Sequence, residues 1–239
     1  MVTTNFVARA FLSLALVASF FVLLTASVIY ADAPKGEVVF SDDFDGTDAQ
    51  AVQSTEDLKR WEFLDPQTWT WKDTDDAGGV VEITERGSAY KPPTRSPGHV
   101  ALVKDLSVGN CEIRFRVRST KDTGNHRDCC VFFGYQDASH FYYCHLGAKP
   151  DPHSGQIMIV NEAPRLALTK NEKLTPWDDQ WHNVMLRRNV DTGLIEVFFD
   201  DMSTPHMSVT DKTFGAGRVG IGSFDDLNAF DQFSVSTFK

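Results

Sequence analysis

The residues best able to do chemistry gather in one stretch of the chain, between Arg95 and Arg165. Five of the seven histidines of the protein fall there, interleaved with tyrosines and aspartates. Imidazole changes its charge near neutral pH, so histidines beside carboxylates can accept and donate protons in a reaction. If the protein is an enzyme, we expect His145, Asp151 and Tyr143 to be its catalytic residues, with His145 and Asp151 as a general acid–base pair.

Six further residues of this stretch are expected to bind a substrate around that centre. Aromatic rings offer flat faces for stacking and polar side chains offer hydrogen bonds, a combination that suits a sugar. Each residue has an alternative reading as a half-buried, hydrogen-bonded structural side chain. No two of the histidines show a familiar metal-ligand spacing. The expected substrate-binding residues are Arg95, Tyr135, Asp137, His153, Asn161 and Arg165.

The strand predicted over residues 140–147 would position this centre. Successive side chains of a strand point to opposite faces, so Phe141, Tyr143 and His145 share one face. Tyr142 and Cys144 belong to the other face. If the first face lines the concave sheet, Tyr143 and His145 meet solvent in a groove, and loops 91–99 and 148–155 form its walls.

The rest of the chain consists of short strands broken by turn signals. Residues 111–118 alternate between apolar and charged side chains, which predicts a half-buried strand. The turn Asp191-Thr192-Gly193 joins two apolar runs and predicts a hairpin. One short helix is expected at 55–61. Ten or more strands without alternating helices predict an all-β, two-sheet antiparallel sandwich of the jelly-roll type, in one domain over 32–239.

Composition and the first residues indicate where the protein works. The 239 residues carry a formal net charge of −10, which argues against binding to nucleic acid or to an anionic membrane surface. Of the 33 acidic residues, 24 are aspartate. No charged residue occurs from Ala10 to Ala31, directly after Arg9. Residues 1–31 therefore predict an export signal cleaved after Ala31, or alternatively an uncleaved membrane anchor over 10–31. The protein is expected to be periplasmic, secreted or on the cell surface.

Export changes how the four cysteines are interpreted. An even number of cysteines in an oxidising compartment favours disulfides. Cys129 and Cys130 are adjacent in one strand and would point to opposite faces, so Cys130 with Cys144 is the preferred bridge, and four buried free thiols are the alternative. There is no CxxC motif and no matching histidine spacing, so zinc is not expected.

Several segments together resemble a known family. The segments SDDFDG, WHNVMLRR, DTGLIEVFFDD, GRVGIGSFDD and FDQFSV are similar to concanavalin A-like lectin/glucanase domains. Among these they are most similar to the laminin-G-like and 3-keto-disaccharide-hydrolase-like group of secreted bacterial proteins, over residues 37–239. The resemblance implies a sandwich that binds or hydrolyses a carbohydrate in a groove on the concave sheet. The alternative is a non-catalytic structural or protein-interaction domain at the cell surface.

The catalytic motifs of that family do not transfer to this chain. Laminarinase-type members carry a Glu-x-Asp-x-x-Glu motif, whereas the strand with Glu112 continues with Arg114, Arg116 and Arg118. Alginate-lyase-like members carry Gln-x-His, and here residues 156–158 read Gln-Ile-Met. Enzyme and binding module therefore both stay open, with a hydrolase-like activity favoured over a lyase-like one. The three arginines are expected to be a solvated outer face rather than a site for an anionic glycan.

The resemblance also implies a structural calcium ion. In calcium-binding members, an acidic residue after the first strand and an aspartate that opens the last strand hold the ion. Asp43 and Asp231 match those two places. An oxygen-rich site of this kind would join the two ends of the sandwich. The alternative is that both residues cap turns.

Overall fold

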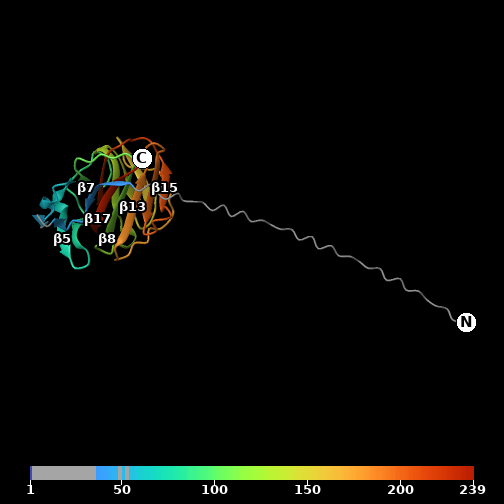
Figure 1. Ribbon diagram of the computed structural model, residues 1–239, viewed down its shortest axis with the longest axis horizontal. Helices are drawn as coiled ribbons and strands as arrows, with labels where there is room; N and C mark the ends of the chain where they lie inside the picture. The colour runs from blue at the N-terminus through green and yellow to red at the C-terminus, as the bar shows by residue number, and fades with distance from the viewer. Residues whose placement is uncertain (2–35, 48–49, 52–53) are drawn as a thin grey trace. The chain divides into compact units, whose positions relative to one another are not determined.

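The computed structural model describes Met1 and residues 36–47, 50–51 and 54–239. Residues 34–239 form one compact unit. Two antiparallel sheets pack face to face in it (Figure 1). The predicted export signal 1–31, or anchor 10–31, lies outside the described residues. In the part of the chain that is described, no helix is both long and apolar enough to cross a membrane.

The first sheet has eight strands. β17 is its longest strand and pairs along its length with β8, while β6 and β1 pair one after the other along its second edge. The order is β15 (Met207–Thr210), β14 (Leu194–Phe199), β13 (His182–Arg188), β8 (Cys111–Ser119), β17 (Asn228–Thr237), β6 (Gly78–Ile83) and β5 (Trp69–Thr74), with β1 (Glu37–Asp42) beside β17.

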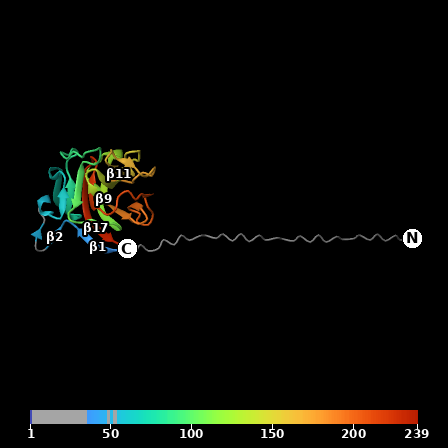
Figure 2. The same ribbon diagram turned by 90° about the horizontal axis from the view of Figure 1, so that it is seen from above.

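The second sheet has seven strands and lies against the first, as the view from above shows (Figure 2). Its order is β12 (Leu166–Ala167), β11 (Gln156–Asn161), β10 (His140–His145), β9 (Cys130–Asp137), β16 (Arg218–Ser223), β7 (His99–Val103) and β4 (Trp61–Phe63). The short pair β2 (Gly46–Thr47) and β3 (Gln50–Ala51) and the 3-10 turns η1 (Thr55–Asp57), η2 (Pro66–Thr68) and η3 (Gly124–His126) complete the described elements.

Alternating side chains build the core between the sheets. On β8, Ile113, Phe115 and Val117 are buried in it, whereas Arg114 is exposed on the outer face. On β10, Tyr142 and Cys144 point into the same core. The predicted all-β sandwich is therefore confirmed, and so is the division of the two faces of residues 140–145.

Most predicted strands are confirmed to within a few residues, and the one predicted helix is wrong. Residues 55–61 form only the 3-10 turn η1, after which Trp61 begins β4 and pairs with Val103. The apolar side chains of this segment gain more by joining the sheet edge than a helix of two turns could offer. The predicted hairpin at 191–193 connects β13 to β14, and Gly193 adopts a φ of +80° there.

The predicted Cys130–Cys144 disulfide is wrong. All four cysteines are buried free thiols, which was the alternative. The register places Cys144 opposite Val131 and His145 opposite Cys130. Cys144 therefore points into the core between the sheets, whereas Cys130 joins the apolar cluster on the outer face of the seven-stranded sheet.

Candidate functional site

The outer face of the seven-stranded sheet carries a second apolar cluster, which includes Cys130, Phe141 and Tyr143. Tyr90, from the loop 84–98, packs against it. Asp65 fixes this loop by accepting hydrogen bonds from the Ser88 hydroxyl at 3.0 Å and the Ala89 amide at 2.5 Å. The middle of this face is thus covered, and the expectation that Tyr143 meets solvent is wrong, since it is 0% exposed.

A pocket of about 420 Å³ opens instead at one end of this sheet. β10 and β16 end there and β9 and β11 begin there, so residues far apart in the sequence meet. Five of the nine predicted site residues line it: Arg95, His145, Asp151, His153 and Arg165. The other lining residues are Asn125, His126, Asp128, Lys149, Ser154, Phe224 and Asp225.

His145 lies at the floor of this pocket, only 5% exposed. Its Nδ1 is 2.9 Å from the carbonyl oxygen of His153, which accepts a hydrogen bond from that nitrogen. Its Nε2 faces a carboxylate oxygen of Asp128 at 3.6 Å, which is longer than a hydrogen bond. Nε2 is buried and has no hydrogen-bond partner among the described residues. The ring is therefore held at one nitrogen and unsatisfied at the other.

Asp128 is a buried carboxylate oriented by its neighbours. Its Oδ1 accepts hydrogen bonds from the Ser223 hydroxyl at 2.8 Å and the Phe224 amide at 3.0 Å. Burial raises the pKa of Asp128, but His145 and these hydrogen bonds outweigh it and hold the pKa below its usual value. Asp226 lies behind it, and burial together with the charge of Asp128 raises the pKa of Asp226 to about 6.

The mouth of the pocket is built around Phe224. The guanidinium of Arg165 lies 4.2 Å from the ring centre and that of Arg95 lies 5.4 Å from it. The ring of His145 stacks on Phe224 at 5.7 Å. A backbone hydrogen bond from Arg165 to Arg95 ties the two arginine loops together. Within the described chain, neither arginine forms an ion pair with a carboxylate.

The predicted acid–base pair is brought into one pocket, but its two members have other neighbours. The Asp151 carboxylate accepts the backbone N–H of His153 at 2.6 Å and so caps the turn 151–154. Tyr143 lies below the pocket, with a buried hydroxyl that lacks a hydrogen-bond partner among the described residues. Burial raises the pKa of that hydroxyl well above its usual value. The catalytic role of these residues stays a prediction.

The other three predicted binding residues lie elsewhere. Asp137 and Asn161 flank His140, at the far end of β10 from His145. The five steps of the strand from His140 to His145 span roughly 17 Å. Tyr135 is 8% exposed and belongs to the covered apolar cluster. These three residues therefore do not share the pocket with His145.

The predicted site residues did not include two that define the pocket, Asp128 and Phe224. Phe224 directly follows β16, whose last residues pair with His99 and Cys130. Only that strand pairing brings residue 224 beside residues 95 and 165. The available signal was the aromatic residue between a buried strand and the acids Asp225 and Asp226.

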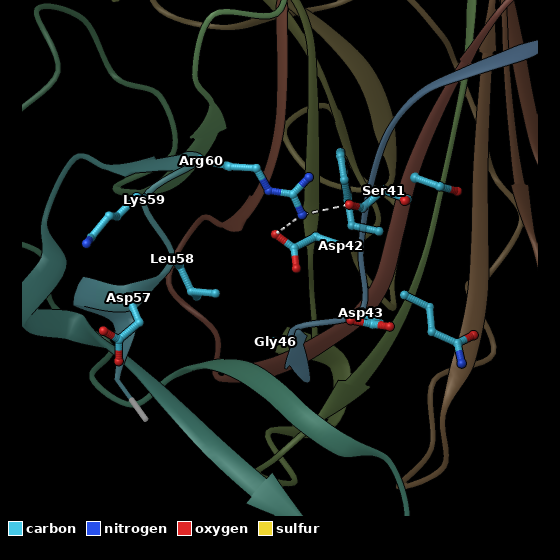
Figure 3. Close-up of a pocket in the computed structure, with 11 residues that line it drawn as sticks. Ser41, Asp42, Asp43, Gly46, Asp57, Leu58, Lys59 and Arg60 are labelled. Carbon is cyan, nitrogen blue, oxygen red and sulfur yellow. Dashed lines mark hydrogen bonds and ion pairs between the residues drawn. The ribbon is translucent and has the colours of Figure 1, made fainter. Parts of the chain in front are cut away.

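The two residues of the predicted calcium site have different surroundings. Asp43 lines a second pocket, of about 740 Å³, with Asp42 and Arg60 nearby (Figure 3). Asp231 is buried, and its carboxylate forms an ion pair with Arg116. Within the described residues, neither belongs to a group of three or more side chains with ligand atoms close enough to hold an ion. The calcium site stays a prediction.

The arginines of β8 form ion pairs on the outer face of the eight-stranded sheet. Arg114 pairs with Glu112 at 2.7 Å, Arg118 with Asp76 at 2.6 Å, and Arg116 with Asp231. The three arginines therefore lie on an outer face, as expected, and the structure pairs each of them with an acidic side chain.

Comparisons with known proteins give the fold. No family model matches the chain, and no curated protein matches it. Among solved structures, a carbohydrate-binding module (CBM66) of Bacillus subtilis is 16% identical with a TM-score of 0.53, covering 74% of this chain and 96% of that one. Domain 4 of an extracellular GH43 arabinanase of Geobacillus stearothermophilus, in complex with arabinotriose, is 13% identical with a TM-score of 0.52, covering 84% and 93%.

A GH43 protein of Bacillus licheniformis is 11% identical with a TM-score of 0.53, covering 83% of this chain and 39% of that one. At these identities the likeness shows the fold alone. The chain has the two-sheet architecture of concanavalin A-like sandwiches, and its structural neighbours include carbohydrate-binding modules and glycan hydrolases.

Proposed function

We propose that the protein binds a glycan in the pocket around His145. The observation that carries the proposal is the pair Arg95 and Arg165, which lie on Phe224 at the pocket mouth without a carboxylate partner in the described chain. A guanidinium group offers several hydrogen bonds in one plane and so suits the hydroxyl or carboxylate groups of a sugar. The Nη1 atom of Arg165 is buried and has no hydrogen-bond partner among the described residues.

Three observations favour binding over hydrolysis. The Nδ1 of His145 is engaged by a backbone carbonyl. The Asp151 carboxylate caps its own turn, and the Tyr143 hydroxyl is buried below the pocket. A glycosidase needs two carboxyl groups that reach the scissile bond together, and the Glu-x-Asp-x-x-Glu motif that supplies the pair in laminarinase-type members is absent from the sequence.

The fold neighbours support the same proposal. One of them is described as a carbohydrate-binding module, and another was solved in complex with arabinotriose. Another neighbour is a GH43 protein, so hydrolysis is the second candidate function.

The test is a glycan array followed by calorimetric titration with the glycans that are retained. Wild type is expected to bind at least one glycan class, and Arg165→Ala to weaken that binding by about tenfold or more, since it removes hydrogen bonds made by a charged group. Arg114→Ala, on the outer face of the eight-stranded sheet, is the matched control and is expected to leave binding unchanged.

Three outcomes would contradict the proposal. If no glycan is retained, the structural or protein-interaction reading takes its place. If Arg114→Ala weakens binding as much as Arg165→Ala does, the glycan lies on the other sheet. Release of reducing sugar from a bound oligosaccharide would replace binding by hydrolysis.

We further propose that the protein acts outside the cytoplasm. The uncharged run from Ala10 to Ala31 supports export. N-terminal sequencing of the exported protein is expected to start at Asp32, and a start at Met1 would favour the anchor.

A further inference from the structure

Three potential metal ligands meet beside the His145 pocket, which Asp128 and His145 line and next to which Cys130 is buried. A carboxylate oxygen of Asp128, the sulfur of Cys130 and a ring nitrogen of His145 all lie within 4.8 Å of one another, and all three residues are buried. They come together by strand pairing, because Cys130 opposes His145 across β9 and β10. Asp128, two residues before Cys130, completes the group.

The histidine presents the nitrogen that a metal would need. Its Nδ1 donates to the carbonyl oxygen of His153 at 2.9 Å, so in the neutral imidazole Nε2 carries the lone pair that a metal would take. A backbone acceptor on the remote ring nitrogen is the usual way in which proteins orient a histidine ligand. Nε2 itself is buried and without a hydrogen-bond partner in the described part of the chain.

The carboxylate is oriented in the same way. Oδ1 of Asp128 accepts hydrogen bonds from the Ser223 hydroxyl and the Phe224 amide. The other carboxylate oxygen, Oδ2, faces Nε2 of His145 at 3.6 Å. When the imidazole is neutral, two lone pairs face each other here, and either a proton on Nε2 or a metal ion between the two atoms relieves their repulsion. Zn–O and Zn–N bonds of about 2.1 Å give a tetrahedral edge of roughly 3.4 Å, close to the separation seen here.

We propose that Asp128, Cys130 and His145 bind one Zn²⁺ ion beside this pocket. Oxygen, nitrogen and sulfur donors together suit Zn²⁺, which is borderline soft and takes four ligands. The Asp128 and His145 atoms already have nearly the separation that a zinc site requires, and the three ligand atoms, which lie within 4.8 Å of one another, contract further when the ion binds. When the ion binds, the Cys130 S–H bond breaks, the sulfur forms a Zn–S bond, and one proton leaves to solvent. A water molecule from the pocket would supply the fourth ligand of a tetrahedral zinc site.

A catalytic triad is a different arrangement of the same residue types. In a triad the acid and the nucleophile contact different ring nitrogens, so that the histidine relays a proton between them. Here a backbone carbonyl holds Nδ1, and the acid Asp128 faces Nε2, the nitrogen that a triad would offer to its nucleophile. This geometry fits convergence on an ion and does not fit a relay.

The test measures zinc directly and needs no glycan, so it is independent of the proposed glycan binding. The full chain is loaded with Zn²⁺, passed through a desalting column and analysed by mass spectrometry for bound metal. One equivalent of zinc is expected. Replacement by Co²⁺ is expected to produce a thiolate-to-cobalt charge-transfer band, which only a cysteine ligand gives.

Two variants assign the ligands. Cys130→Ser is expected to abolish the charge-transfer band and to weaken Zn²⁺ binding by at least about 100-fold, measured against a chromophoric chelator. Cys129→Ser is the matched control, because Cys129 points into the core between the sheets. It is expected to keep both the band and the affinity. Ser223→Ala, which removes a hydrogen bond to Asp128, is expected to weaken binding by about 10- to 100-fold.

Wild-type protein that retains no zinc and gives no cobalt band would overturn the proposal. So would a band of equal intensity in folded Cys130→Ser. If Cys130→Ser does not fold by circular dichroism, the cobalt band of wild type and its loss in His145→Asn decide the question without it.

Discussion

Arginines serve opposite purposes on the two sheets. On the outer face of the eight-stranded sheet, Arg114, Arg116 and Arg118 each have an acidic partner, and the Asp231 carboxylate that pairs with Arg116 is only 1% exposed. At the end of the seven-stranded sheet, Arg95 and Arg165 stack on Phe224 with no acidic partner in the described chain.

The difference separates stability from binding. An arginine that forms an ion pair with a carboxylate has few N–H groups free to bind a ligand, and its removal leaves the charge of that carboxylate uncompensated. A cation without a partner contributes little to folding and keeps its hydrogen bonds available for a ligand. The following changes are expected to divide in the same way.

The largest effect on stability is expected from Arg116→Ala. It leaves Asp231 buried without its cation, which should lower the free energy of unfolding by about 3 kcal/mol. Arg114→Ala is the control, because its ion pair with Glu112 is more exposed, and it should cost less than about 1 kcal/mol. Urea denaturation measures both. Equal losses for the two variants would remove the distinction between the buried and the exposed pair.

A smaller effect is expected from Asp65→Ala, in the loop that covers the seven-stranded sheet. Burial raises the pKa of Asp65, but hydrogen bonds from Ala89 and Ser88 outweigh it and hold the pKa below its ordinary 3.8. The ionised carboxylate therefore stabilises the fold above that ordinary value, and the stabilisation is lost as the pH falls below it. The variant should lose about 2 kcal/mol at neutral pH and less at acid pH.

Hydrogen exchange locates that loss. Faster exchange is expected in residues 84–98, the loop that contributes Arg95 to the pocket. Asp201→Ala is the matched control, since the Asp201 carboxylate also accepts a backbone hydrogen bond but lies on an exposed turn. Unchanged exchange in the loop of Asp65→Ala would show that other contacts hold the wall.

The fold could be predicted from the sequence because its signals are local. Alternation over residues 111–118 and the turn at 191–193 determine strands and a hairpin without knowledge of distant residues. The helix expected at 55–61 was wrong because the pairing of Trp61 with Val103 is a long-range contact. Propensity in a short segment does not contain that information.

The site could be predicted only in part, for the same reason. His145 and Asp151 were found from residue type, but Tyr143 was expected in solvent because nothing in the sequence shows that the loop 84–98 covers it. The predicted Cys130–Cys144 bridge was wrong because the register of β9 against β10 is offset by one residue from the one that the bridge requires. That same register places Cys130 opposite His145, an arrangement that no spacing along the chain reveals.

The smallest effect on stability is expected from the double variant Arg95→Ala/Arg165→Ala. Neither guanidinium holds a carboxylate in the described chain, so their loss should change the free energy of unfolding by less than about 1 kcal/mol, chiefly through the contacts with Phe224. Glycan binding, in contrast, should fall below detection. Arg116→Ala should behave in the reverse way, with reduced stability and unchanged binding at a temperature where it stays folded. If the double variant lost as much stability as Arg116→Ala, the pocket arginines would be structural, and the argument from unpartnered cations to a ligand would fail.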